Sequence, residues 1–190
     1  MDLEAYNPLD IPNLGKSLTE AFLARPLQPL PTHTFKGAGI YGLYYLAPEG
    51  EGNELYRREM RGKVPIYVGK AMSAGSPNTL YQRLGDHRKS IEAAPNLRIE
   101  DFQCRFLLVD DVWIPLGEQL LIDKFNPLWN KKIKGFGNKT LGAERESQKP
   151  APWDLIHPGR QRSTNPTTEA EREKLLATLK KYLDSLSDDD

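Results

Sequence analysis

The sequence predicts an α+β fold, in which a small mixed or antiparallel sheet of three strands is flanked by helices. Three segments rich in aromatic and β-branched residues are typical of strands, and a helical pattern follows the second and the third of them. The resulting order β, β, α, β, α favours a small sheet with helices packed on it. At 190 residues, the chain is long enough for one ordinary domain with terminal additions.

The chain begins with a segment that we read as an N-terminal helical arm, residues 1–35. A helix is expected over Leu14–Ala24, because the pattern there is helical and stops before a proline-rich connector, "RPLQPLPTHT".

The first two strands are predicted in "AGIYGLYYLA" (38–47) and "VPIYVGK" (64–70). Pro48 and Gly50 close the first strand and a polar segment leads to the second. We therefore expect an antiparallel hairpin whose connection has been lengthened.

A helix, a strand and a second helix follow. Asn78 is the expected cap of the first helix, whose apolar stripe comprises Leu80, Leu84, His87 and Ile91. The third strand is expected in "FQCRFLLV" (102–109). The second helix is expected from Ile114 to Phe125, with Pro115 in its first turn and Asn126-Pro127 ending it.

The rest of the chain is less regular. Residues 131–166 are basic and rich in Gly and Pro, and we assign no element to them. An amphipathic helix is expected over 167–186, marked by Leu175, Leu176, Leu179, Leu183 and Leu186. The predicted domains are thus the arm (1–35), a core (36–133) and a basic loop segment with a C-terminal helix (134–190) packed on the core.

Composition excludes several classes of protein. One cysteine rules out a disulfide framework and a zinc finger, and three histidines far apart in sequence speak against a histidine-built metal site. No apolar run reaches the roughly 18 residues that a membrane span needs, and no secretion signal opens the chain. We expect a soluble, cytoplasmic protein with no membrane partner.

The net charge is zero, but the charges are unevenly distributed. Residues 36–90 hold nine Lys/Arg against five Asp/Glu and residues 130–165 hold eight against three, whereas 91–129 hold three against seven. Two basic blocks around an acidic one could form a charged cleft, since binding responds to local potential. The alternative is an ordinary mixed surface.

Glu118 is the residue that the helical pattern explains least. It lies on the row of Ile114, Leu121 or Ile122, and Phe125, which should face the sheet. A carboxylate there is costly unless it is paired or binds a cation. The alternative is that Glu118 lies at the margin of the row and reaches solvent or pairs with Arg83.

Six polar residues follow one another in an order that packing alone does not explain. Tyr41 and Tyr67, taken alone, are ordinary strand residues, and Arg83 lies one helical turn before His87. The ordered set is Tyr41, Tyr67, Arg83, His87, Glu118 and Asn130.

With these motifs the chain resembles the GIY-YIG nuclease superfamily across residues 36–133. Its two naming motifs are present as "GIY" and "YVG", the second followed by Lys70 and by the helix with Arg83 and His87, and "GEQLLIDKFNPLWN" carries Glu118 and Asn130. Val68 replaces the isoleucine of the name, and two connections are longer than in compact repair and homing members. "GFGNKTLGAERE" and "WDLIHPGR" further resemble the type II restriction endonucleases of this superfamily that cut a GC-rich palindrome, for which CCGCGG is the candidate.

The resemblance implies a mechanism for phosphodiester hydrolysis. Glu118 would be the one protein carboxylate on a Mg²⁺ ion, which prefers oxygen ligands and keeps several waters. Arg83 would hold a phosphate oxygen. Tyr41 would be the general base, helped by Lys70 and His87 because a free phenol is a poor base at neutral pH, while Tyr67 would orient the water or phosphate. Asn130 would brace the site.

The implied partner is double-stranded DNA, and no small-molecule substrate is expected. A palindrome cut on both strands requires two active sites, most simply in a homodimer. The basic residues where we expect DNA contacts are Arg57, Arg58, Arg61, Lys131, Lys132 and Lys134. The alternative for each is a phosphate contact without sequence readout, or plain solvation.

Three other functions stay open on the sequence. The first is a repair or homing nuclease. The second is a DNA-binding module that has lost catalysis, although all six polar residues are intact. The third is a structural domain in which these residues are ordinary core and surface.

Overall fold

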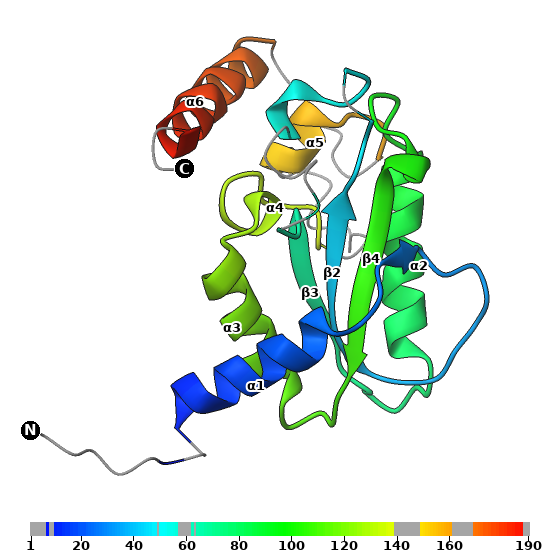
Figure 1. Ribbon diagram of the computed structural model, residues 1–190. Helices are drawn as coiled ribbons and strands as arrows, with labels where there is room; N and C mark the ends of the chain where they lie inside the picture. The colour runs from blue at the N-terminus through cyan, green and yellow to red at the C-terminus, as the bar shows by residue number, and fades with distance from the viewer. Residues whose placement is uncertain are drawn as a thin grey trace, which may run out of the picture.

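The computed structural model describes most of the chain and arranges it as one sheet with helices on both faces (Figure 1). The described residues are 7, 10–48, 50–56, 62, 64–138, 149–160 and 169–187. In chain order the elements are α1 (Ile11–Leu23), β1 (Gln28–Pro29), β2 (Gly39–Tyr45), the 3-10 turn η1 (Glu54–Tyr56), β3 (Tyr67–Ala71), α2 (Thr79–Glu92), the 3-10 turn η3 (Ile99–Asp101), β4 (Phe102–Leu108), α3 (Ile114–Phe125), α4 (Leu128–Lys131), α5 (Pro152–Ile156) and α6 (Glu169–Ser187).

The described sheet has four strands in the order β1-β4-β2-β3, and every pair is antiparallel. The α+β class is confirmed, but the predicted number of three strands is wrong. The fourth strand, β1, comes from the proline-rich connector, where Gln28 pairs with Cys104 and Pro29 with Gln103. It lies at the sheet edge, where proline is tolerated because no neighbouring strand needs its missing N–H. A strand of two residues is too short to show an alternation of apolar and polar side chains, so the sequence could not reveal it.

The predicted hairpin of β2 and β3 is confirmed. Tyr41 pairs with Gly69 and Leu43 with Tyr67, so the two naming tripeptides lie on neighbouring strands and meet at the Tyr41–Gly69 pair. On its other edge β2 pairs with β4, and all seven of its residues are buried. β2 is thus a central strand with core on both faces.

Different helices cover the two faces of the sheet. On one face, α1 and α3 pack through Phe22, Ile114 and Leu121 against Ile40 and Val68. On the other face, α2 contributes Leu80, Leu84 and Ile91 to a larger cluster that includes Tyr41, Tyr67 and Trp129. The alternation of β2 therefore sends Tyr41 to the face of α2, which becomes the face of the site.

Helix ends follow the expected signals closely. α3 begins at Ile114 with Pro115 in its first turn and ends before Asn126, which adopts the left-handed conformation at φ 47°. α2 follows Asn78 as predicted. The Asn78 side chain makes no cap bond to the backbone, because its Oδ1 accepts from Ser76 and Gln82 instead. α1 begins at Ile11, three residues before the predicted start, with Pro12 in its first turn.

The C-terminal elements join the core of the larger face. Trp153 and Ile156 of α5 and Leu179 of α6 belong to the same cluster as Tyr41. The predicted C-terminal helix is confirmed as α6, and α4 and α5 were not predicted. The division of the chain into three domains stays a prediction. Within the described part of the chain, none of the helices has both the length and the apolar character needed to cross a membrane.

Candidate active site

Tyr41 reaches the site because glycine stands opposite it on β3. A Cβ atom at Gly69 would collide with the Tyr41 hydroxyl and lie 2.9 Å from Cε1 of Tyr67. The missing side chain lets the Tyr41 ring cross β3 towards α2, where its hydroxyl lies 2.6 Å from Nε2 of His87. The glycine of "YVG" is therefore required by close approach.

Gly39, which opens "GIY", is required for a different contact. A Cβ there would overlap the backbone carbonyl of Leu107 on β4. Each glycine thus allows a contact between neighbouring strands that any side chain would prevent.

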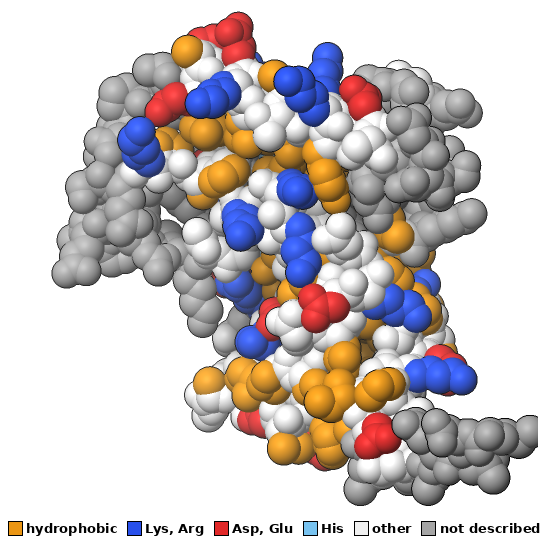
Figure 2. Space-filling model, turned by 90° about the vertical axis from the view of Figure 1, so that its left-hand side faces the viewer, with side chains coloured by type: hydrophobic (Ala, Val, Ile, Leu, Met, Phe, Trp, Pro, Cys, Tyr) orange, Lys and Arg blue, Asp and Glu red, His pale blue; other side chains and the backbone are white. Residues whose placement is uncertain are grey.

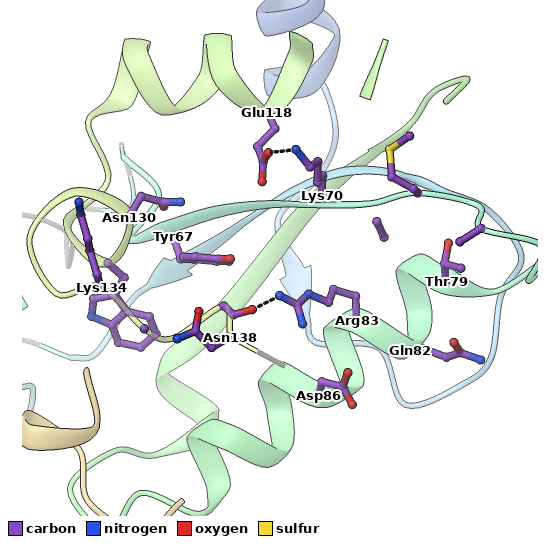
Figure 3. Close-up of a pocket in the computed structure, with 16 residues that line it drawn as sticks. Tyr67, Lys70, Thr79, Gln82, Arg83, Asp86, Glu118, Asn130, Lys134 and Asn138 are labelled. Carbon is purple, nitrogen blue, oxygen red and sulfur yellow. Dashed lines mark hydrogen bonds and ion pairs between the residues drawn. The ribbon is translucent and has the colours of Figure 1, made fainter. Parts of the chain in front are cut away.

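A pocket of about 660 Å³ opens beside Tyr67 (Figure 3). Its walls come from β3, α2, α3, α4 and the segment that follows α4. Figure 3 shows the Tyr67 hydroxyl directed into it, with Glu118 and Lys70 on one side and Arg83 on the other. The polar and charged side chains that line it are those of Tyr67, Lys70, Thr79, Gln82, Arg83, Asp86, Glu118, Asn130, Lys134 and Asn138.

Glu118 pairs with Lys70. The distance from Glu118 Oε2 to Lys70 Nζ is 2.7 Å, and the two side chains are 20% and 41% exposed. The alternative interpretation paired Glu118 with Arg83, but Arg83 donates instead to the carbonyl of Gly137. The carboxylate on the apolar row of α3 is thus at the rim of the pocket, next to one cation.

Asn130 binds the backbone of β3 with both ends of its amide. Its Oδ1 accepts from the Val68 N–H and its Nδ2 donates to the Val68 carbonyl, each at 2.8 Å. Val68 lies between Tyr67 and Gly69, so Asn130 ties α4 to the strand that carries the site. β3 is the sheet edge, and this amide satisfies backbone groups that an edge leaves unpaired.

His87 is buried between three aromatic rings. It lies 5.4 Å from the ring of Tyr41 and 5.2 Å from that of Tyr67, and it stacks on Phe136 at 4.5 Å with an interplanar angle of 17°. Phe136 also meets the edge of Tyr67 at 5.1 Å. Tyr67 lines the pocket, and the buried side chains of Tyr41 and His87 pack against it from the interior.

Burial raises the pKa of Tyr41 well above its ordinary value of 10.0, and the neighbouring Tyr67 raises it further, against the opposing effect of Arg83. Burial likewise raises the pKa of Tyr67, again opposed by Arg83. Tyr41 is fully buried, and Lys70 pairs with Glu118. The help that Lys70 and His87 would give to Tyr41 as a base stays a prediction.

The predicted DNA-contacting residues are only partly described. Arg57, Arg58 and Arg61 lie outside the described residues. Among the lysines, Lys134 lines the pocket, Lys131 pairs with Asp123 at 3.2 Å, and Lys132 lies 4.1 Å from the ring centroid of Tyr182. Figure 2 shows Lys and Arg side chains gathered across the middle of one face of the molecule, above an apolar area.

Sequence reasoning missed the segment that closes one side of the pocket. Phe136 and Gly137 contact His87, Tyr67 and Arg83, and they lie in the stretch to which we assigned no element. The signal was present in the motif "GFGN", because Gly137 has no room for a Cβ beside the Tyr67 hydroxyl.

The side chains present fit a magnesium ion. No cluster of three or more His, Cys, Asp or Glu side chains occurs among the described residues. Glu118 is partly exposed, faces the pocket and already attracts a cation in Lys70. Because Mg²⁺ is commonly held by one or two carboxylates with substrate phosphates and water, one carboxylate in an open pocket is a suitable donor set.

Comparison with known proteins agrees with this geometry. The sequence model of one family, described as the Eco29kI GIY-YIG domain, matches residues 33–183. A search of curated protein sequences gave no match. The matched range contains both tyrosines of the site, Arg83, His87, Glu118 and Asn130, together with the segment around Phe136 and α5. The chain therefore belongs to the Eco29kI GIY-YIG domain family, a restriction-endonuclease family of GIY-YIG nucleases.

Proposed function

We propose that this nuclease is a type II restriction endonuclease that cuts both strands of DNA at a short GC-rich palindrome, with Mg²⁺ as cofactor. The observation that carries the proposal is one pocket in which Tyr67, Arg83 and Glu118 meet, with the Tyr41–His87 pair directly behind. A nucleophile site, a phosphate site and a carboxylate for a metal are the parts that phosphodiester hydrolysis needs. Membership of this family supports a restriction endonuclease rather than a repair or homing nuclease.

The proposed proton path runs from water through Tyr41 to His87. Burial disfavours a lasting phenolate, so Tyr41 can act as a base only if its own proton leaves as it gains one from water. Nε2 of His87, 2.6 Å away, accepts that proton in the tautomer that leaves Nε2 unprotonated. The resulting hydroxide attacks phosphorus, and Tyr67 orients it from the pocket side.

Arg83 is the proposed phosphate ligand. Its planar fork offers two donors to phosphate oxygens and stays charged. In the structure one donor is taken by the carbonyl of Gly137. DNA binding would therefore replace this carbonyl with a phosphate oxygen, and the movement of Gly137 would also open the way for water beside Tyr67.

Glu118 is the proposed ligand of Mg²⁺, with Lys70 as the neighbouring cation. When bound there, the ion would neutralise negative charge on the phosphate and on the departing 3′ oxygen. Lys70 holds the carboxylate at the pocket rim before DNA arrives. Asn130 keeps β3, and with it Tyr67, in place through the Val68 backbone.

We further propose a homodimer in the cytoplasm, with one active site on each DNA strand. The residues proposed to contact DNA remain Arg57, Arg58, Arg61, Lys131, Lys132 and Lys134. Lys134 has the strongest support, because it lines the same pocket as Tyr67 and Glu118.

Incubation of the purified protein with phage DNA and Mg²⁺ tests the proposal. Discrete fragments that end at one GC-rich palindrome are expected. Smearing or structure-dependent nicking would instead indicate another kind of nuclease, and a mobility shift without cutting would indicate a DNA-binding module. Sedimentation of the free protein would separately test the dimer.

A further inference from the structure

Arg160, the last residue of the motif "WDLIHPGR", is a buried cation outside the ordered set of six polar residues. Its side chain is 4% exposed, its Nη2 lies 2.7 Å from Oδ1 of Asp154, and its guanidinium carbon lies 4.0 Å from the ring centroid of Trp153. A buried guanidinium is costly unless its remaining donors are satisfied. The acceptors that these donors bind therefore indicate the role of Arg160.

The remaining donors of Arg160 join three parts of the fold. Nη1 donates to the carbonyl of Phe136 at 3.0 Å and to Oγ of Ser90 on α2 at 3.4 Å, and Nη2 donates to the carbonyl of Gly135 at 3.3 Å. Arg160 thus holds the segment of Gly135 and Phe136 against α2 and α5.

That segment contacts the proposed catalytic side chains directly. The Phe136 ring stacks on His87 at 4.5 Å and meets the edge of Tyr67 at 5.1 Å. The next residue, Gly137, accepts a hydrogen bond from Arg83 through its carbonyl. The two carbonyls that Arg160 binds thus belong to the segment that contacts His87 and Arg83.

We propose that Arg160 is a positioning residue of the nuclease, which fixes the imidazole of His87 and the resting position of Arg83 through the segment 135–137. Three donor directions are used at once, towards Asp154, towards the two carbonyls and towards Ser90. A planar guanidinium supplies them from three separate nitrogens, whereas the ammonium of lysine carries all its donors on one nitrogen. Arg160→Lys keeps the charge but should release the segment.

The inference rests on the proposed roles of His87 and Arg83, so its test needs a readout besides cleavage. The chain has three histidines, of which His33 is exposed and distant from Arg160 in sequence. In a histidine-selective NMR spectrum, Arg160→Lys should move the His87 resonance, because the Phe136 ring current changes, while that of His33 stays. His157 packs on Trp153 at 4.9 Å and is expected to move as well, so His33 is the internal reference.

Cleavage under single-turnover conditions gives the second readout. We expect Arg160→Lys to lower the rate roughly 10- to 100-fold with unchanged DNA binding, as a small misplacement of a catalytic group does. The pH profile should change too, because the proton path through His87 is altered. Leu179→Ala, a core truncation in α6, is the control for loss of stability and should leave the folded protein's rate and the His87 resonance unchanged.

An unchanged His87 resonance in folded Arg160→Lys would overturn the proposal, as would a rate loss that Leu179→Ala reproduces at equal stability. If Arg160→Lys does not fold, Phe136→Leu keeps Arg160 and removes only the stacked ring. An unchanged rate and pH profile in Phe136→Leu would then overturn it. If the wild type cuts no DNA, the proposed function fails, but the His87 resonance still tests the positioning.

Discussion

The hydroxyl of Tyr41 lies 2.6 Å from Nε2 of His87, and both side chains are buried behind the pocket. Removing that hydroxyl breaks the proposed proton path without changing the ring that fills the space. We expect Tyr41→Phe to bind DNA normally and to cut it roughly 10²- to 10⁴-fold more slowly at neutral pH. Single-turnover cleavage and a mobility shift measure the two effects.

Tyr81→Phe is the matched control for that variant. The Tyr81 hydroxyl is on the exposed side of α2 and donates to the Thr32 carbonyl at 3.3 Å, away from the pocket. It should cut at the wild-type rate. Wild-type cleavage by Tyr41→Phe would remove Tyr41 from the proton path.

Gly69 should not tolerate a methyl group. The Cβ of Gly69→Ala would lie 2.6 Å from Cζ of Tyr41 and 2.9 Å from Cε1 of Tyr67, so both rings must move. We expect a loss of about 1–3 kcal/mol in the free energy of unfolding, together with a loss of cleavage. Urea denaturation measures the first effect.

Gly85→Ala serves as the comparison, because a Cβ at Gly85 in α2 meets no atom within 4 Å. Alanine is the better helix former there, and a gain of roughly 0.5–1 kcal/mol is expected. Equal effects of the two substitutions would show that the contact across β3 is unimportant.

Asn130 should be sensitive even to isosteric replacement. In Asn130→Asp the side chain can no longer donate to the Val68 carbonyl, and a carboxylate oxygen then faces a carbonyl oxygen. We expect a loss of about 1–3 kcal/mol in the free energy of unfolding, and slower cleavage because β3 carries Tyr67. A fully stable, fully active Asn130→Asp would argue against the view that the hydrogen bonds of Asn130 to the Val68 backbone hold β3 in place.

Acid should destabilise the protein through His157. Burial, with a smaller effect of Arg160, lowers the pKa of His157 from 6.5 to about 3. Between these values the unfolded chain binds a proton that the folded protein does not. His157 therefore does not lower the free energy of unfolding above pH 6.5. As the pH falls from 6.5 towards 3, the free energy of unfolding decreases by about 1.4 kcal/mol per pH unit at most.

Urea denaturation between pH 7.5 and 5 measures this slope. His157→Gln should reduce it, and the substitution of the exposed His33 by Gln should leave it unchanged. An identical slope in His157→Gln would show that folding does not lower the pKa of His157.

Much of the fold could be predicted because its signals are local. The pattern of α3 and the signals of Pro115 and Asn126 gave the observed bounds of that helix, and the hairpin followed from two aromatic segments. β1 could not be predicted, because two residues next to prolines show no periodicity and pair only through tertiary contact with β4.

The sequence predicted which residues form the site better than it predicted the contacts between them. The motifs named Tyr67, Arg83 and Glu118, and these meet at one pocket. The partners did not follow from spacing: Lys70 binds Glu118, and Arg83 binds Gly137. The first contact depends on how α3 packs on β3, and the second on how the segment after α4 packs on α2. Pairwise contacts over such separations leave no periodic signal in one sequence.

The central claim is that the pocket at Glu118 performs metal-dependent hydrolysis of DNA. The most direct measurement compares the wild type with Glu118→Ala in Mg²⁺, at equal folded concentration, by mobility shift and by cleavage of the same DNA. We predict that both proteins bind and that only the wild type cuts. Cleavage by Glu118→Ala at a rate near that of the wild type would contradict the claim.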